Sequence, residues 1–420
     1  MNNKITKNES YIFNIIICSV ALYPTIESLP ITNINFVMSV IYSLIFIAFL
    51  IYFRFKILLI SFSPVLFLSI IPLIISIFVP FLIEQYIDKA YLSFLLLLFF
   101  IIPLYNYIIK SYLNKNFFIN NQFRYILLFI SLISILICNA NKGYYGYVTG
   151  GGGNINNVLA TIIPTFYIAT SPFNKGLNIN TRLFFLFITS IFSLIIYTID
   201  AKYSFLSLLI YTIFTLFTII PRLKGYVISR NLIFWGIVFT FFLQIIFYIS
   251  SLISTTDGEF VLFDLDILFS LPYYNSISYR LLVFSYFFKD LSLRSLSHTF
   301  VLGHGFGSLA RELTLYVPQL GDKVAEESWA PHNLLIQFIH DFGLLLPYFT
   351  IKSLLKPLRI NLSIIYIFKK ILQPLILQKL FFILLALLPL LACANPYQPF
   401  SSIWIFILLI YDTFATKKRA

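Results

Sequence analysis

Charged residues are scarce in this chain of 420 residues, because Asp, Glu, Lys and Arg make up only 11% while hydrophobic residues make up 60%. About a quarter of the residues in a soluble domain are charged. A chain this apolar would expose large apolar patches in water, so soluble fold classes are excluded. A membrane β-barrel is disfavoured, because its strands alternate apolar and polar residues. Continuous apolar runs of about twenty residues instead predict membrane-spanning helices.

Cysteine is equally scarce, with Cys18, Cys138 and Cys393 each inside or at the end of an apolar run. Without a CxxC pair, neither a zinc ribbon nor a redox motif is supported, and we expect buried thiols. Basic residues outnumber acidic ones by 29 to 16. They are scattered between apolar segments instead of being gathered on one face. They therefore indicate membrane orientation and not binding of nucleic acid.

Twelve segments are long and apolar enough to span a bilayer, which predicts an all-α polytopic membrane protein with about 12 transmembrane helices. A single large loop separates helices 9 and 10. The expected organisation is helices 1–9 in residues 1–254, a loop with amphipathic helices in residues 255–331, and helices 10–12 in residues 332–420. The segments lie near residues 11–27, 32–53, 57–83, 90–109, 123–139, 155–171, 182–199, 203–221, 231–253, 333–354, 378–394 and 400–416.

The distribution of basic residues predicts which side each connection occupies. If the N-terminus is cytoplasmic, 21 of the 29 Lys and Arg residues fall on the cytoplasmic side, and the short loops of the opposite side hold 3. Basic residues concentrate in cytoplasmic loops of membrane proteins. We therefore expect both termini in the cytoplasm and the long loop on the outer face.

All four histidines fall in and just after the long loop, at His298, His304, His332 and His340. Ionisable groups at a membrane face are costly and often mark function, although a solvated loop also carries charge. Arg280 begins an amphipathic stretch, where a guanidinium can hold a phosphate by two hydrogen bonds or can reach to the lipid headgroups.

The tenth predicted span begins after His332 and contains His340 and Asp341. The field at a helix N-terminus favours a neutral imidazole, so His332 is a candidate general base, and the alternative is a histidine that faces lipid headgroups. An acid at the depth of Asp341 needs a partner, and both a structural pair and a catalytic group fit its position.

Three further features leave two interpretations each. The run Gly303-His304-Gly305-Phe306-Gly307 is either a turn that passes close to a ligand or a simple turn. The glycines at 150–153, before Asn157, allow close approach of a ligand or form a flexible turn. The pair Asp264 and Asp266 resembles the metal-binding acids of nucleotide-sugar glycosyltransferases, but it also alternates with apolar residues as a half-buried strand does.

Together these pieces resemble the O-antigen ligase and O-antigen polymerase superfamily of bacterial inner-membrane proteins. The resemblance covers roughly residues 150–345 and the layout with one large periplasmic loop between helices 9 and 10. It depends on four pieces in order. These are the glycine turn before Asn157-Val158-Leu159-Ala160, Lys202 where the family usually has arginine, Arg280 followed by the glycines at 303–307, and His332-Asn333 followed by Asp341-Phe342-Gly343.

The resemblance implies transfer of a glycan from undecaprenyl pyrophosphate on the periplasmic face, without a metal, a cofactor or a nucleotide sugar. His332 would accept the proton of the acceptor hydroxyl, and Arg280 and Lys202 would neutralise the leaving pyrophosphate. Lysine keeps the charge but loses the two-pronged hydrogen bonding of arginine. The expected substrate-binding residues are Asn157, Gly303, His304, Gly305, Gly307, Arg311, Asn333 and Asp341.

The expected partners are the lipid-linked oligosaccharide, the bilayer and, as a further candidate, a protein that regulates chain length. A polymerase is favoured, since polymerases are often rich in Ile, Phe and Tyr. The alternatives are a ligase, whose acceptor is the lipid A core, and a flippase of lipid-linked sugars. A flippase predicts charged residues inside several spans, whereas here only His340 and Asp341 are clearly internal.

Overall fold

The structure is a computed structural model of the chain. It describes residues 14–15, 17–22, 44, 48, 51, 121–140, 155–173, 178–199, 201–219, 303–304, 309, 334–344, 348, 374–391 and 400–414. Every regular element among these residues is α-helical, as the apolar runs predict. The helices are α6 (Asn121–Ala140), α7 (Ile155–Thr170), α8 (Ile179–Thr198), α9 (Lys202–Ile219), α16 (Leu334–Phe342), α19 (Pro374–Leu391) and α20 (Phe400–Phe414).

Local sequence explains where several of these helices begin. The side chain of Asn178 accepts a hydrogen bond from the Thr181 amide at 2.8 Å and so caps α8. Asparagine is among the strongest N-cap residues. Pro374 is the first residue of α19. An amide proton at this position would have no acceptor within the helix, so proline loses no helical hydrogen bond there. Between α8 and α9 the chain turns over three residues, and the Phe205 amide donates to the carbonyl of Ala201 at 2.8 Å.

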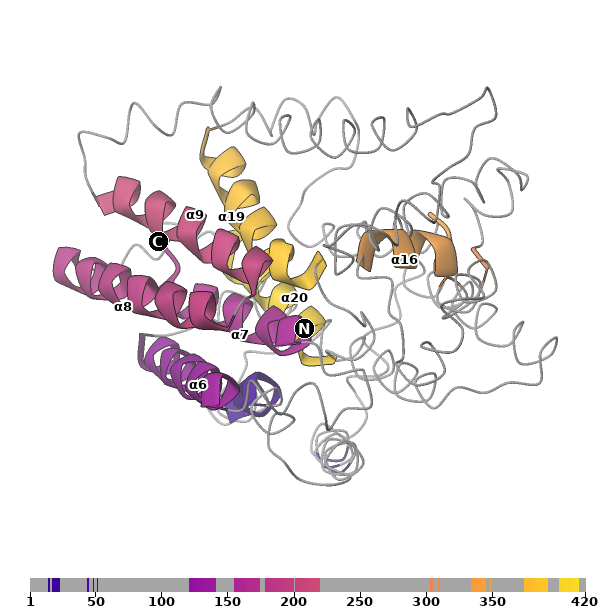
Figure 1. Ribbon diagram of the computed structural model, residues 1–420, viewed down its shortest axis with the longest axis horizontal. Helices are drawn as coiled ribbons and strands as arrows, with labels where there is room; N and C mark the ends of the chain where they lie inside the picture. The colour runs from indigo at the N-terminus through magenta and orange to yellow at the C-terminus, as the bar shows by residue number, and fades with distance from the viewer. Residues whose placement is uncertain are drawn as a thin grey trace, which may run out of the picture.

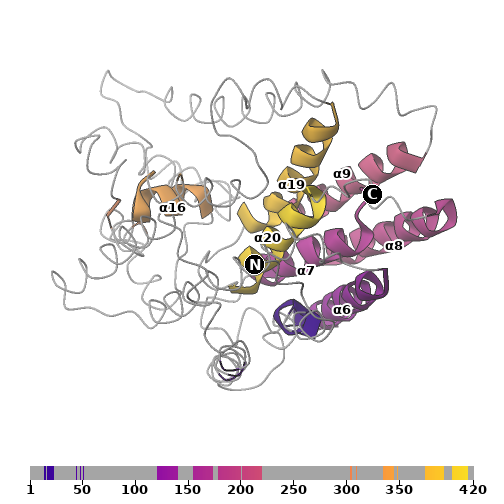
Figure 2. The same ribbon diagram turned by 180° about the vertical axis from the view of Figure 1, so that it is seen from behind.

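Helix α7 lies at the centre of a bundle with α6, α19 and α20 around it, and α8 packs against α6 and α9 (Figures 1 and 2). Every described side chain of α7, from residue 158 to residue 170, is buried. Phe166 stacks on Phe192 of α8 with ring centroids 4.4 Å apart, and Tyr167 stacks on Phe382 of α19 at 5.4 Å. These aromatic contacts join α7 to helices on two sides.

Several hydroxyl groups inside the bundle bond to one another, which offsets the cost of burying polar groups. Ser207 of α9 lies 2.7 Å from the Tyr167 hydroxyl and donates to the carbonyl of Leu385 at 2.6 Å. The hydroxyls of Thr170 and Tyr211 lie 2.9 Å apart. Because residues 167 and 170 of α7 meet residues 207 and 211 of α9 in the same order, the two helices run in the same direction.

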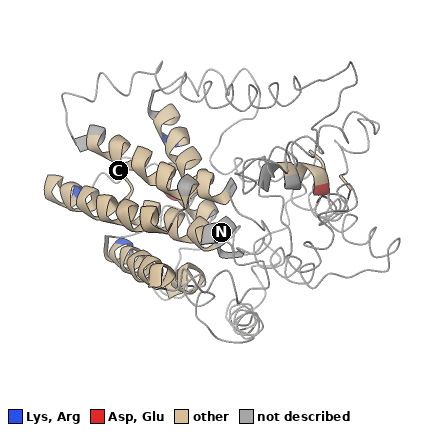
Figure 3. Cartoon of the chain, viewed as in Figure 1, with Lys and Arg blue, Asp and Glu red and all other residues tan. Residues whose placement is uncertain are grey.

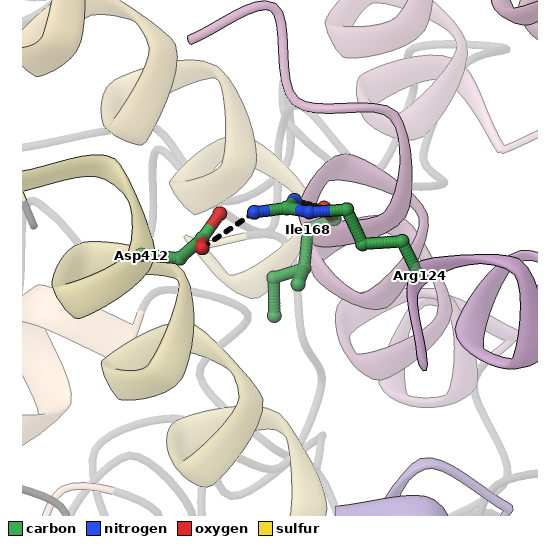
Figure 4. Close-up of polar contacts among 3 residues, drawn as sticks. All are labelled: Arg124, Ile168 and Asp412. Atoms are coloured by element: carbon green, nitrogen blue, oxygen red, sulfur yellow. Dashed lines mark hydrogen bonds and ion pairs between the residues drawn. The ribbon is translucent and has the colours of Figure 1, made fainter. Parts of the chain in front are cut away.

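A buried ion pair closes one end of the bundle (Figure 4). The guanidinium of Arg124, near the start of α6, donates to the Asp412 carboxylate of α20 at 2.7 Å, and the two side chains are 7% and 8% exposed. A second guanidinium nitrogen donates to the carbonyl of Ile168, near the end of α7. One side chain thus connects the beginning of one helix to the ends of two others, so α6 runs opposite to α7 and α20.

Lys379, near the start of α19, is buried at this same end of the bundle. Its ammonium lies 5.5 Å from the ring centroid of Phe414 and 5.9 Å from that of Phe173. An ammonium over an aromatic face is attracted by the ring quadrupole. Figure 3 shows how few charged residues the described helices carry, so two basic groups and one acid at one end are a distinct feature.

The expectation of about 12 transmembrane helices with one large loop between helices 9 and 10 is wrong for the described part of the chain. Within it, only two helices are both long and apolar enough to cross a membrane, at Gln122–Ala140 and Ile179–Thr198. Helix α7 has 16 residues and α20 has 15. At 1.5 Å per residue these helices reach about 24 Å and 22 Å, less than the hydrocarbon core of about 30 Å.

The span predicted at residues 333–354 shows the physical reason why the number of spans was wrong. Helix α16 has 9 residues, and after it Gly343 takes a φ of 67°, in the left-handed region that ends helices. Continuous apolar sequence indicates burial away from water, but it does not indicate where a helix stops. The spans predicted at 57–83, 90–109 and 231–253, most of the 255–331 loop and the limits at 254 and 331 lie outside the described residues.

We expect the ion pair to contribute strongly to stability. Removing one partner of a buried pair leaves an uncompensated charge and typically costs about 3–5 kcal/mol. Asp412→Ala and Arg124→Ala should therefore each lower the free energy of unfolding in detergent by about that amount. Arg124→Met combined with Asp412→Leu should recover most of the loss.

The matched control is Arg182→Ala, which removes a half-buried arginine of α8 and should cost under about 1 kcal/mol. Thermal or denaturant unfolding of the purified variants measures both effects. If the double substitution is as unstable as the two single changes added together, the two side chains do not interact.

Candidate functional site

The strongest candidate site lies where Gly303 and His304 meet the C-terminal end of α16. The His304 amide donates to the carbonyl of His340 at 2.9 Å. The last carbonyls of a helix have no partner within the helix, so this bond satisfies one of them. In Figures 1 and 2, α16 lies beside the bundle, next to the end at which α9 begins.

Gly303 is required for this contact for two reasons. Its φ is 72°, in the left-handed region that side chains disfavour. A Cβ at this position would lie 2.5 Å from the carbonyl oxygen of Asp341 and from the amide nitrogens of Phe342 and Gly343. All three atoms belong to the main chain, so no rotamer change can relieve the clash. The backbone at Gly303 therefore rests directly on the backbone of α16.

Asp341 makes the second contact between the two segments. Its Oδ1 atom accepts a hydrogen bond from the Leu309 amide at 3.1 Å, and Leu309 is fully buried. The same oxygen lies 3.5 Å from Nδ1 of His340, and both of these side chains are 0% exposed. An acid deep in an apolar surrounding thus has two nearby donors when His340 carries its proton on Nδ1.

The imidazole of His304 lies against that of His340, with ring centroids 4.3 Å apart and planes at 46°. Among these three ionisable side chains, His304 is partly exposed, whereas His340 and Asp341 are fully buried. A histidine that is fixed by its own amide and backed by a buried ring can form a hydrogen bond with a hydroxyl group of a ligand or exchange a proton with it. This arrangement suits ligand recognition or proton transfer at the partly exposed imidazole of His304.

Three of the predicted substrate-binding residues, Gly303, His304 and Asp341, are therefore brought together from distant parts of the sequence. Asn157 lies in the first turn of α7, and Lys202 is the first residue of α9. Because these two helices run in the same direction, both positions fall toward one end of the bundle, opposite the ion pair. The predicted residues Arg280, Gly305, Gly307, Arg311, His332 and Asn333 lie outside the described residues.

The hydrogen bond from Leu309 to Asp341 and the bond between Arg124 and Asp412 were not predicted from the sequence. Leu309 contributes only its backbone amide, which any residue except proline could supply. The bond between Arg124 and Asp412 joins residues 288 positions apart. A partial signal existed for the latter, because Asp412 is one of two acids on the side predicted to be cytoplasmic, the other being Glu9.

Among the residues that the structure describes, no group of three His, Cys, Asp or Glu side chains is arranged to hold a metal ion. Comparison of the chain with protein-family models, with curated proteins and with solved structures finds no match.

Gly303→Ala should weaken the contact of Gly303 and His304 with the end of α16. The new methyl group meets three main-chain atoms, and overpacking of this kind typically costs about 1–3 kcal/mol, with the left-handed φ adding about 1–2 kcal/mol. Hydrogen–deuterium exchange of the purified protein should show faster exchange of the His304 amide. Leu344→Ala removes an exposed side chain beside the same turn and should leave that amide protected, whereas unchanged protection in Gly303→Ala would contradict the close contact.

Proposed function

We propose that this protein is a membrane glycosyltransferase of the O-antigen polymerase type, which joins repeat units carried on undecaprenyl pyrophosphate at the periplasmic face of the inner membrane. One observation carries the proposal. The glycine–histidine turn and the Asp341-Phe342-Gly343 segment are separate pieces of the sequence pattern, and the backbone of Gly303 lies directly against that of residues 341–343. A pattern whose distant pieces meet in space is better supported than its sequence spacing alone.

The chemistry of the site is compatible with this reaction. The acceptor hydroxyl attacks the anomeric carbon of the donor sugar, the bond from that carbon to the pyrophosphate oxygen breaks, and the hydroxyl proton passes to a base. In our proposal His332 takes the proton, and Arg280 and Lys202 neutralise the leaving pyrophosphate. The partly exposed His304 contacts the sugar, and the buried residues Gly303 and Asp341 hold His304 in place. Asn157, Gly305, Gly307, Arg311 and Asn333 provide further contacts.

Burial in the bundle supports a membrane location. Helix α8 buries Phe185, Phe192 and Ile196 against its neighbours. Its other face exposes large apolar side chains, with Phe187 62% and Leu194 65% exposed. Water disfavours such a face, and acyl chains do not. At 20 residues, or about 30 Å, α8 matches the thickness of the hydrocarbon core.

The basic residues of the described helices support the proposed orientation. Arg124 and Lys379 meet at the ion-pair end of the bundle. Arg182 lies in the first turn of α8, which runs opposite to α9 and therefore begins at that same end. Since basic residues favour the cytoplasmic side, we place this end inside the cell, with both termini cytoplasmic, and the docked histidine segment toward the periplasm.

The glycan phenotype of a deletion strain tests the proposed function. Loss of a polymerase should leave lipopolysaccharide capped with a single repeat unit. Lipid-linked polymer with an uncapped core would indicate a ligase, which uses the same donor but a different acceptor. Repeat units that accumulate at the cytoplasmic face would indicate a flippase. Either of the last two outcomes would replace the polymerase assignment.

The role of His332 is tested with purified protein and a synthetic lipid-linked repeat unit. General-base assistance is typically worth about 10²–10⁴ in rate, so His332→Ala should lose about that factor while it still binds donor. His298→Ala is the matched control and should be nearly silent. A wild-type rate in His332→Ala would exclude it as the base. Chelator is present throughout, and loss of wild-type activity with it would instead favour a metal at Asp264 and Asp266.

A further inference from the structure

We propose that Asp341 is a positioning residue, which holds the docked segment on α16 through its acceptor oxygen and not through its charge. The docked segment is defined by Gly303, His304 and Leu309. This inference rests on the proposed function only for its effect on turnover. The docking itself follows from the contacts between the two segments.

Among the described residues, two hydrogen bonds, one close approach and one contact between imidazole rings join the two segments. The His304 amide bonds to the carbonyl of His340, and the Leu309 amide bonds to Oδ1 of Asp341. Gly303 rests on the backbone of residues 341–343. The hydrogen bond of the His304 amide and the close approach of Gly303 involve main-chain atoms, and the imidazole of His304 also lies against that of His340. The hydrogen bond from Leu309 is accepted by the side chain of Asp341, so it is a point at which a substitution can release the segment.

Distance and burial indicate that the acceptor oxygen matters more than the charge. The separation of 3.1 Å between the Leu309 nitrogen and Oδ1 is within the range of a good hydrogen bond. The separation of 3.5 Å between His340 Nδ1 and the same oxygen is longer than a good hydrogen bond. Leu309 is 0% exposed, so its amide would lose its acceptor in a place where water does not readily replace it. An uncharged amide oxygen at position 341 can still accept this bond.

Release of the segment should affect chemistry more than binding. Helix α16 begins two residues after His332 in the sequence and is about 13 Å long, so only a short helix separates the docked end from the proposed base along the chain. His304 would move relative to that element once Leu309 is released. Misplacement of reacting groups by about 1 Å can cost 10²-fold in rate. We therefore expect turnover to fall about 10²-fold, with a change in KM of less than about threefold.

The test compares Asp341→Asn with Asp341→Ala in the full-length protein. Asparagine keeps an oxygen that can accept from Leu309 but removes the charge, and alanine removes both. Hydrogen–deuterium exchange reports the Leu309 amide, and transfer to a synthetic lipid-linked repeat unit reports kcat and KM. Asp412→Asn is the matched control, because it changes another buried acid that lies in the separate ion pair.

We expect Asp341→Ala to exchange the Leu309 amide at least about tenfold faster and to lose about 10²-fold in kcat. Asp341→Asn should stay within about threefold of wild type in both measurements, and Asp412→Asn should leave the Leu309 amide protected. If the charge of Asp341 were what mattered, Asp341→Asn would be impaired, so near-wild-type behaviour of this variant excludes that role. Asp341→Asn can be compared with the wild type even if the alanine variant does not fold.

The opposite outcomes are distinct. If Asp341→Asn is as impaired as Asp341→Ala, the charge beside His340 matters and the acceptor role is overturned. If Asp341→Ala keeps wild-type protection and turnover, Asp341 does not position the segment, although the proposed function stands. If the wild type transfers no sugar while Asp341→Ala still loses protection at Leu309, the docking stands and the proposed function fails.

Discussion

The buried bond between Arg124 and Asp412 is the interaction on which the arrangement of the bundle depends. A charge in an apolar surrounding is tolerated only with a partner, so any packing that separated these two side chains would strand both. The guanidinium also bonds to Ile168, and it thereby fixes which end of α6 meets the ends of α7 and α20. Apolar helix faces can slide and rotate against one another with small changes in energy. We infer that the ion pair selects one register among such alternatives.

Hydroxyl groups then fix the register of α9 and α19 against the central helix. Ser207 accepts from Tyr167 while it donates to Leu385, so one serine connects three helices. In the proposed membrane location the association of helices would gain little from the hydrophobic effect, because lipid is as apolar as a leucine side chain. Packing and hydrogen bonds would then supply the free energy of association. The close stacking of Phe166 on Phe192 and the buried hydroxyls provide both.

Sequence reasoning predicted the helical class of the described elements and singled out Gly303, His304 and Asp341 as candidate site residues, because glycine and ionisable residues stand out in an apolar chain. It failed on the number of spans, because an apolar run such as 333–354 carries no clear signal of where its helix stops. It also could not predict a bond across 288 positions, or the use of Leu309, whose contribution is a backbone amide. Ionisable side chains are visible in the sequence, whereas the backbone groups that hold them in place are not.

The failed span and the candidate site have the same physical origin. In a continuous helix the carbonyl of His340 would accept the amide of residue 344. Because α16 ends at Phe342 and Gly343 turns with a φ of 67°, that carbonyl is free to accept the His304 amide instead. Helical bonding resumes beyond the turn, where the Tyr348 amide donates to Leu344. A break in a helix within an apolar protein must have its backbone groups satisfied by neighbouring protein. The docked segment supplies that partner, so the interruption that shortens α16 is also what allows a histidine from a distant part of the chain to be held against it.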